Sequence, residues 1–127
     1  MNQEIPGPDR IRATVAEYLR RIEASSAAGI ADLYTDTATV EDPVGSDVRT
    51  GRDAILPLYA GLEHSRNSTE LLTLRIAGNE AAFHFRVTSE VDGTECVFEP
   101  IDVMTFADDG RIASMRAFWS ASDTRSS

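Results

Sequence analysis

Apolar residues recur with a helical period in the first half of the chain. The first stripe, spaced mostly three or four positions apart as on one face of a helix, consists of Ile11, Val15, Tyr18, Leu19 and Ile22. The stretch SSAAG at 25–29 ends this helix. A short second helix is expected to carry Ile30, Leu33 and Tyr34 on one side, and a third to carry Ile55, Leu58, Tyr59 and Leu62. Pro57 is expected near the start of the third helix, because a proline further inside would remove a hydrogen bond.

The second half of the chain alternates between apolar and polar positions, which is typical of strands. Four strands are predicted, at LLTLRI (71–76), AAFHFRVTS (81–89), ECVFEPIDVMTF (95–106) and RIASMRAFWSA (111–121). The turns between them are AGNE, VDGT and ADDG, of which the last two contain the hairpin signal Asp-Gly. A shorter strand, TATVE at 37–41, ends at Asp42-Pro43, and Pro100 indicates a bulge or an edge in the third long strand.

This order of elements predicts an α+β fold. Three N-terminal helices are expected to pack in a curved, mostly antiparallel β-sheet. The helices and the sheet together are expected to form a cone-shaped pocket for a small ligand. The length of 127 residues suits one domain over 1–127, in which residues 1–8 and 121–127 are expected to be loose.

Composition excludes several kinds of partner. A formal net charge of −9 argues against nucleic acid and against an anionic membrane surface. No apolar run approaches the ~20 residues of a membrane helix, and the first residues do not resemble a signal peptide. A single cysteine, Cys96, forms no intramolecular disulfide, while His64 and His84 lie far apart and make no metal cluster. These features predict a cytoplasmic protein, and the sequence offers no ligand cluster for a metal or cofactor.

Asp102 is an acid in the middle of an apolar strand face. Its alternating neighbours on that face are Cys96, Phe98, Pro100, Met104 and Phe106. Burial there disfavours the charged carboxylate and raises the pKa, and a protonated carboxylic acid can donate a hydrogen bond. An edge strand, or a buried aspartate that caps a neighbouring backbone group, would explain the same pattern, so the spacing leaves these interpretations open.

The adjacent acids Glu41 and Asp42 point to opposite faces of their strand, because successive side chains alternate. Asp42 shares a face with Ala38 and Val40, so it is expected to point inward, whereas Glu41 continues the polar face and is expected to be solvated. An inward aspartate at a strand end can be a catalytic base or can cap the following turn.

The chain has three tyrosines, and each is expected on the inward stripe of a different helix: Tyr18, Tyr34 and Tyr59. Taken singly, each is explained by core filling with the hydroxyl bonded to a backbone carbonyl. Together, three buried hydroxyls could form a network. Trp119 shares a face with Met115 and Ala117, and is explained either as a core aromatic or as the wall of an apolar pocket.

The chain resembles the ketosteroid isomerases, within the wider group of cone-shaped nuclear-transport-factor-2-like folds. The resemblance covers residues 10 to 120. It is carried by Tyr18 in AEYL, by LYTDTATVEDPVG, by TGRDAI with Tyr59, by PIDVMTF with Asp102 and by RIASMRAFWS with Trp119. The spacing from Tyr18 to Asp42 and on to Asp102 is also similar to that of the family.

The resemblance implies an isomerase that moves the double bond of a 3-oxo-Δ5-steroid to Δ4. Asp42 would transfer the proton from C4 to C6, and Tyr18 and a neutral Asp102 would donate to the C3 oxygen, an arrangement used as a standard example of pKa tuning. Tyr34 and Tyr59 would support Tyr18. The residues implied to line or support the pocket are Trp119, Phe85, Val87, Met115 and Phe118. The resemblance further implies a homodimer formed through the open face of the sheet, and a small apolar ketone as partner.

Other functions occur on the same fold, because a fold does not determine its chemistry. A polyketide cyclase would share an inward acid without needing the tyrosines and Asp102. An epoxide hydrolase is expected to use an Asp-Arg-Asp set, and the candidate arginines lie on polar strand faces: Arg75, Arg86 and Arg116. A non-catalytic binding module would lose the acids, so the joint presence of Tyr18, Asp42 and Asp102 favours the isomerase.

Overall fold

The structure is a computed structural model that describes residues 6–126. Within this range the helices are α1 (Pro8–Glu23), α2 (Ala27–Ala31), α3 (Arg52–Tyr59) and the 3₁₀ turns η1 (Ala60–His64) and η2 (Ala121–Asp123). The strands are β1 (Tyr34–Glu41), β2 (Arg49–Thr50), β3 (Arg66–Ala77), β4 (Glu80–Val91), β5 (Thr94–Phe98), β6 (Ile101–Phe106), β7 (Ile112–Phe118) and β8 (Thr124–Ser126).

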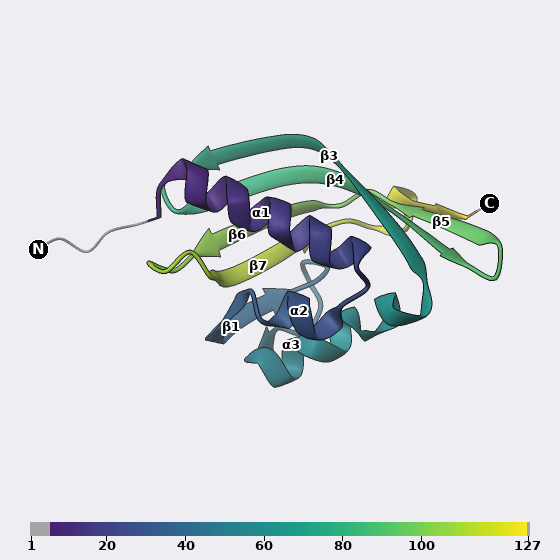
Figure 1. Cartoon of the computed structure of the whole chain (residues 1–127), viewed down its shortest axis with the longest axis horizontal. Coiled ribbons are helices and arrows are strands. Elements are labelled where there is room, and N and C mark those ends of the chain that lie inside the picture. Colours follow the sequence, from purple (N-terminus) through teal and green to yellow (C-terminus); the bar gives the residue numbers. More distant parts are fainter. Residues whose placement is uncertain (1–5, 127) are drawn as a thin grey trace, which may run out of the picture.

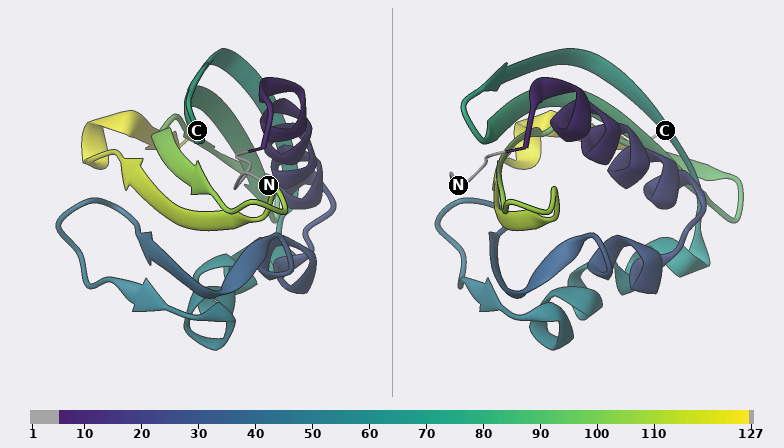
Figure 2. Two further views of the ribbon diagram at one scale, coloured as in Figure 1. Left: turned by 90° about the vertical axis from the view of Figure 1, so that its left-hand side faces the viewer. Right: turned by 60° about the vertical axis from the view of Figure 1, so that its left-hand side comes forward.

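The described strands form one curved sheet in the order β2-β1-β7-β6-β4-β5-β8, with β3 paired to β4. All pairs are antiparallel except β1 with β7, which run parallel. The sheet curls around α1, which lies across its concave side, while α2 and α3 pack beside β1 (Figures 1 and 2). The predicted α+β fold with three helices and a curved, mostly antiparallel sheet is confirmed.

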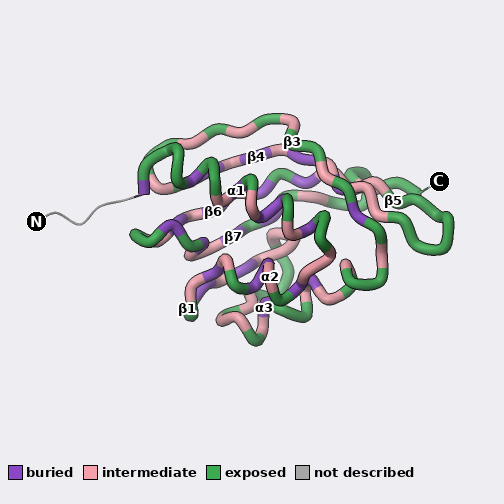
Figure 3. The backbone as a smooth tube through the Cα atoms, viewed as in Figure 1, coloured by how far each residue is buried: buried purple, intermediate pink, exposed green. Residues whose placement is uncertain are grey.

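One apolar core lies between α1 and the concave face of the sheet. Helix α1 starts with Pro8 in its first turn, where proline is tolerated. All five residues of the stripe predicted for this helix are buried. Buried and less buried positions alternate along β4 and β6 (Figure 3), as expected for strands with one face on the core. The alternation brings Asp102 to the inner face of β6.

Three details of the predicted helices were wrong. Helix α2 ends at Ala31, and Tyr34 is the first residue of β1 rather than part of a helix. Its ring still points inward and is fully buried, because a strand face can present a side chain to the core as well as a helix stripe can. Helix α3 already begins at Arg52, so Pro57 lies inside it. The α-helix ends two residues later, at Tyr59, and continues as the 3₁₀ turn η1.

The strand predictions need two corrections. The long strand predicted at 95–106 is divided into β5 and β6 at Glu99-Pro100, where a bulge or an edge was expected, and both pieces pair with β4. Residues 121–126 were predicted to be loose, but they form η2 and β8, and β8 pairs with β5. At the other end Pro8 already belongs to α1, and residues 1–5, like Ser127, lie outside the described part of the chain.

Candidate active site

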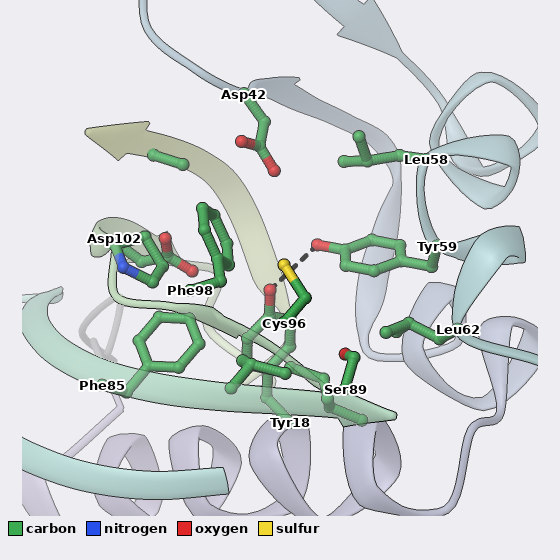
Figure 4. A pocket seen from close by; sticks show the side chains of 14 residues that line it. Tyr18, Asp42, Leu58, Tyr59, Leu62, Phe85, Ser89, Cys96, Phe98 and Asp102 are labelled. Atoms are coloured by element: carbon green, nitrogen blue, oxygen red, sulfur yellow. Dashed lines mark hydrogen bonds between the residues drawn. The ribbon is translucent and has the colours of Figure 1, made fainter. Parts of the chain in front are cut away.

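A cavity of about 180 Å³ opens between α1, α3 and the concave face of the sheet. Tyr18, Asp42 and Asp102 all line it, although they come from three elements far apart in the sequence (Figure 4). Most of the remaining wall is apolar, and it includes Phe85, Val87, Phe98, Leu58 and Leu62. Polar groups that converge in an apolar pocket are the usual form of a small-molecule site.

Asp42 follows directly after β1 and points into this cavity, as the alternation of β1 predicted. Its Oδ1 accepts a hydrogen bond of 2.6 Å from the indole Nε1 of Trp119. Burial raises the pKa of Asp42 above its ordinary value, and the indole hydrogen bond and the charge of Arg49 partly offset this effect. A carboxylate that is partly desolvated binds a proton more readily than an exposed one, which suits a base that must accept and return a proton.

Asp102 lies on β6 and is 2% exposed. Its Oδ2 is buried and accepts or donates no hydrogen bond within the described residues. Burial raises the pKa of Asp102 well above its ordinary value, and the negative charge of Asp42 adds to the effect, while the hydroxyl of Tyr18 acts in the opposite direction. A raised pKa favours the neutral carboxylic acid, whose O–H group can be donated to a ligand.

The three tyrosines form a chain of hydrogen bonds that ends in the cavity. The hydroxyl of Tyr59 lies 3.1 Å from that of Tyr18 and 2.7 Å from that of Tyr34. Burial raises the pKa of all three phenols well above the ordinary value, so each keeps its proton. Tyr59 links the other two, and the sequence expectation of a tyrosine network is confirmed.

Comparison with known proteins places this chain in a family. Residues 4–115 match the model of the SnoaL-like domain. The steroid Delta-isomerase of Nocardioides simplex is 50% identical to this chain over 113 residues, which are 89% of this chain and 92% of the relative. The chain belongs to the steroid Delta-isomerase family, with a SnoaL-like domain.

Three other proteins resemble this chain more distantly. The epoxide hydrolase LasB of Streptomyces lasalocidi is 29% identical over 93% of this chain, which spans about half (51%) of that relative. A second similar protein is SalBIII, an epoxide hydrolase/cyclase-like enzyme with a role in pyran ring formation in the polyether salinomycin. Its structure superposes on this one with a TM-score of 0.82 at 30% identity, and the match covers 91% of this chain and 95% of SalBIII. RV0760c from Mycobacterium tuberculosis shares the fold. Its TM-score is 0.85 at 17% identity, and the match covers 96% of this chain and 99% of RV0760c.

The pocket residues implied for this isomerase family member divide into two groups. Phe85 and Val87 line the cavity. Trp119 does not line it, but holds Asp42 and packs edge-on against Phe98, with ring centroids 5.0 Å apart. Met115 is buried in the core without lining the cavity.

Phe118 was implied to line or support the pocket, and the structure does not place it there. It is 42% exposed, and the guanidinium of Arg116 lies 5.3 Å from its ring centroid. The reason is the alternation of β7, which turns Ala117 toward the cavity and Phe118 away from it. Cys96, Phe98 and Pro100 line the cavity instead, and their place on the same strand face as Asp102 was the signal that could have found them.

Two polar residues outside the cavity are held by contacts with neighbouring side chains. The side chain of Glu41, expected to be solvated, is only 22% exposed; its carboxylate lies 3.2 Å from Nε of Arg116 and accepts a hydrogen bond from the backbone N–H of Gly45. These contacts lower the pKa of Glu41. His84 lies on the outer face of β4, 3.3 Å from the carboxylate of Glu99. Neither residue lines the cavity.

Clusters of metal-ligating side chains and membrane-spanning helices are both absent from the described residues. No group of three or more histidine, cysteine, aspartate or glutamate side chains within residues 6–126 could hold a metal ion. Over the same residues, no helix has the length and apolar character needed to cross a membrane.

Replacement of Asp102 by asparagine is expected to change how stability depends on pH. Above about pH 4 the unfolded chain releases the Asp102 proton, whereas the folded protein keeps it, because the folded-state pKa lies well above 3.8. The Asp102 contribution to the free energy of unfolding therefore falls as pH rises, by up to about 1.4 kcal/mol per pH unit, until the folded-state pKa is reached. Asp102→Asn has no such proton, so this decrease in the free energy of unfolding is absent from the variant. The free energy of unfolding of Asp102→Asn relative to wild type should therefore increase with pH above about 4. Urea unfolding at several pH values measures the difference, and a constant difference would contradict a neutral Asp102.

Proposed function

We propose that the protein is a steroid Δ-isomerase, which moves the double bond of a 3-oxo-Δ5-steroid to Δ4. The observation that carries the proposal is the pair of acids in one cavity. Asp42 is partly buried and hydrogen-bonded as a carboxylate, whereas Asp102 is fully buried, with an oxygen that has no partner within residues 6–126. Acids whose environments raise their pKa values to different extents can divide the roles of base and hydrogen-bond donor. The 50% identity to a steroid Delta-isomerase supports the same reaction.

Asp42 is proposed as the base that carries one proton across the substrate. Its carboxylate takes a proton from C4, and the electron pair of that C–H bond forms a C3–C4 double bond while the C3 oxygen becomes negative. The resulting dienolate then takes the proton back from Asp42 at C6. The C3 carbonyl re-forms and the second double bond comes to lie between C4 and C5. The proton removed is the proton returned, so the reaction needs no co-reactant.

Tyr18 and Asp102 are proposed to stabilise the negative C3 oxygen of the dienolate. Both line the cavity, and both keep their protons because burial raises their pKa values. Hydrogen-bond donors that face a developing charge in an apolar site stabilise the transition state more than they would in water. Tyr59 and Tyr34 extend the chain behind Tyr18 and hold its hydroxyl in place.

The proposal is tested by mixing the purified protein with 5-androstene-3,17-dione and following the absorbance of the conjugated enone. Rapid formation of the enone is the expected result. A folded protein that forms no enone would overturn the proposal. In that case steroid binding without turnover would indicate a binding module, and a protein that does not bind steroid would be tested with polyketide-derived substrates.

Epoxide hydrolase or polyketide cyclase chemistry is the alternative, since SalBIII and LasB share the fold. No arginine of the described chain lines the cavity, although an Asp-Arg-Asp set would need one there. Arg49 is near enough for its charge to affect Asp42, but its Nη1 donates to the backbone carbonyl of Ala54. Arg86 and Arg116 are paired with glutamates away from the cavity. The cavity therefore favours the isomerase.

A homodimer in the cytoplasm completes the proposal. Ile101 and Phe118 are cross-strand partners on the outer face of the sheet, and they are 45% and 42% exposed. Exposed apolar side chains that adjoin one another on an open sheet face offer a surface that a second copy of the chain could cover. Sedimentation at micromolar concentration tests this, and a monomer would refute the dimer without affecting the proposed reaction.

A further inference from the structure

The wall of the cavity carries a second polar group, the hydroxyl of Ser89, away from the two acids. Ser89 lines the cavity on β4, opposite Cys96 of β5. The β4 partner of Asp102 is Phe83, and Ser89 lies six residues further along the same face of this strand. Figure 4 shows Asp102 and Ser89 on opposite sides of the cavity. A rigid ligand with its ketone at Tyr18 and Asp102 would thus direct its other end toward Ser89.

Helix α1 leads in the same direction. Tyr18 and Ile22 line the cavity one turn apart. Just beyond the helix, Ser25 joins a group of polar side chains around Asn67 of β3. Asn67 is only 7% exposed. Helix α1 and strand β4 therefore both run from the acids to the same group of polar side chains. We name this group the Asn67 cluster, and its members are Ser25, Ser65, Asn67 and Ser89.

The cluster determines where the hydroxyl proton of Ser89 points. The amide Nδ2 of Asn67 donates to the backbone carbonyl of Leu62 at 3.0 Å. A carbonyl can only accept, so the amide oxygen of Asn67 must face the other way, toward Ser65 and Ser89. That oxygen accepts from the hydroxyl of Ser65 at 2.8 Å and from the hydroxyl of Ser89 at 2.7 Å. The single proton of the Ser89 hydroxyl is therefore used within the protein.

We propose that Ser89, oriented by Asn67, selects steroids with a hydroxyl group at the end of the ring system opposite the reacting ketone. With its proton given to Asn67, Ser89 offers only lone pairs to the cavity, so it can accept from a hydroxyl but cannot donate to a ketone. A ketone at that position would place its own lone pairs against those of Ser89. This inference rests on the proposed isomerase function and specifies its substrate class.

The test compares two substrates that differ only at C17, 17β-hydroxy-5-androsten-3-one and 5-androstene-3,17-dione. We expect the wild type to prefer the hydroxyl substrate by about fivefold to tenfold in kcat/KM, the effect of one neutral hydrogen bond. The preference should appear mainly in KM, because the distal group does not touch the reacting atoms. In Ser89→Ala the ratio of the two kcat/KM values should fall to about one.

Two further variants separate selection from a general disturbance of the cluster. Ser65→Ala removes the other hydroxyl that donates to Asn67, but Ser65 does not line the cavity, so the preference should remain. Asn67→Ala leaves Ser89 in place and frees its proton, which can then be donated to a ketone. The kcat/KM of the ketone substrate should rise, so the ratio of the hydroxyl to the ketone substrate should fall. If Asn67→Ala does not fold, Ser89→Ala and Ser65→Ala still decide the question.

The outcomes distinguish this inference from the proposed function. Equal kcat/KM values in the wild type, or a preference that survives Ser89→Ala, would overturn the selection by Ser89 and leave the isomerase intact. If the wild type isomerises neither steroid, the proposed function fails, and the inference that rests on it fails as well.

Discussion

Replacement of Asp42 by asparagine is expected to lower kcat for steroid isomerisation by about 10²–10⁴-fold, the contribution of a well-placed general base. The amide keeps the size of the side chain and its oxygen can still accept from the indole of Trp119. It cannot take a proton from C4, so KM should change much less than kcat. The rate of enone formation by purified wild type and variant measures the effect.

The neighbouring acid provides the matched control. Glu41→Gln removes the adjacent carboxylate, which pairs with Arg116 away from the cavity. This variant should retain nearly the wild-type kcat. Equal losses of activity in the two variants, or an active Asp42→Asn, would show that Asp42 is not the base. The explanation of this aspartate as a cap of the following turn would then be favoured.

Replacement of Tyr18 by phenylalanine is expected to lower kcat by about 10²–10³-fold, as the loss of one oxyanion donor does elsewhere. The ring and its edge-to-face contacts with Phe83 and Phe85 remain, so the fold should be preserved. Only the hydroxyl, which lies 3.1 Å from that of Tyr59 and is proposed to face the C3 oxygen, is lost. Enone formation at saturating substrate measures kcat, and circular dichroism verifies folding.

Tyr34→Phe is the control for the Tyr18 variant, because it removes the end of the hydrogen-bond chain farthest from the cavity. It leaves the contact between Tyr59 and Tyr18 in place, so its effect on kcat should be about tenfold or smaller, in line with the loss of one neutral hydrogen bond. An effect of Tyr34→Phe as large as that of Tyr18→Phe would show that the network as a whole, rather than the Tyr18 donor, determines the rate.

The sequence predicted the faces of the elements well, because the side-chain period of a strand or helix is a local property. The alternation around Asp102 placed this acid on the inner face of its strand, and the structure confirms it. The same rule turned Asp42 inward and Glu41 outward. Where the element itself was misjudged, as for Tyr34, the inward direction was still right, because both interpretations put an apolar ring against the core.

The sequence could not predict which inward residues meet, because residues far apart in the chain are brought together only when the strands pair and the helices pack. The bond between Trp119 and Asp42 joins residues 77 positions apart, next to the parallel pairing of β1 with β7. Alternation along the strand separates Trp119 from Phe118, but no local pattern shows that the indole of Trp119 is bonded to Asp42. The bond between Asn67 and Ser89 likewise depends on β3 pairing with β4 in one register.

By itself, then, the sequence determined an α+β fold with two acids and three tyrosines directed inward, since periodicity encodes direction. Only the tertiary structure decided that Tyr59 links Tyr34 to Tyr18 and that both acids share one cavity. It also decided that the buried oxygen of Asp102 has no partner within the described chain. The physical reason is that a pKa and a donor direction depend on desolvation and on neighbouring charges, and these exist only once distant segments have packed together.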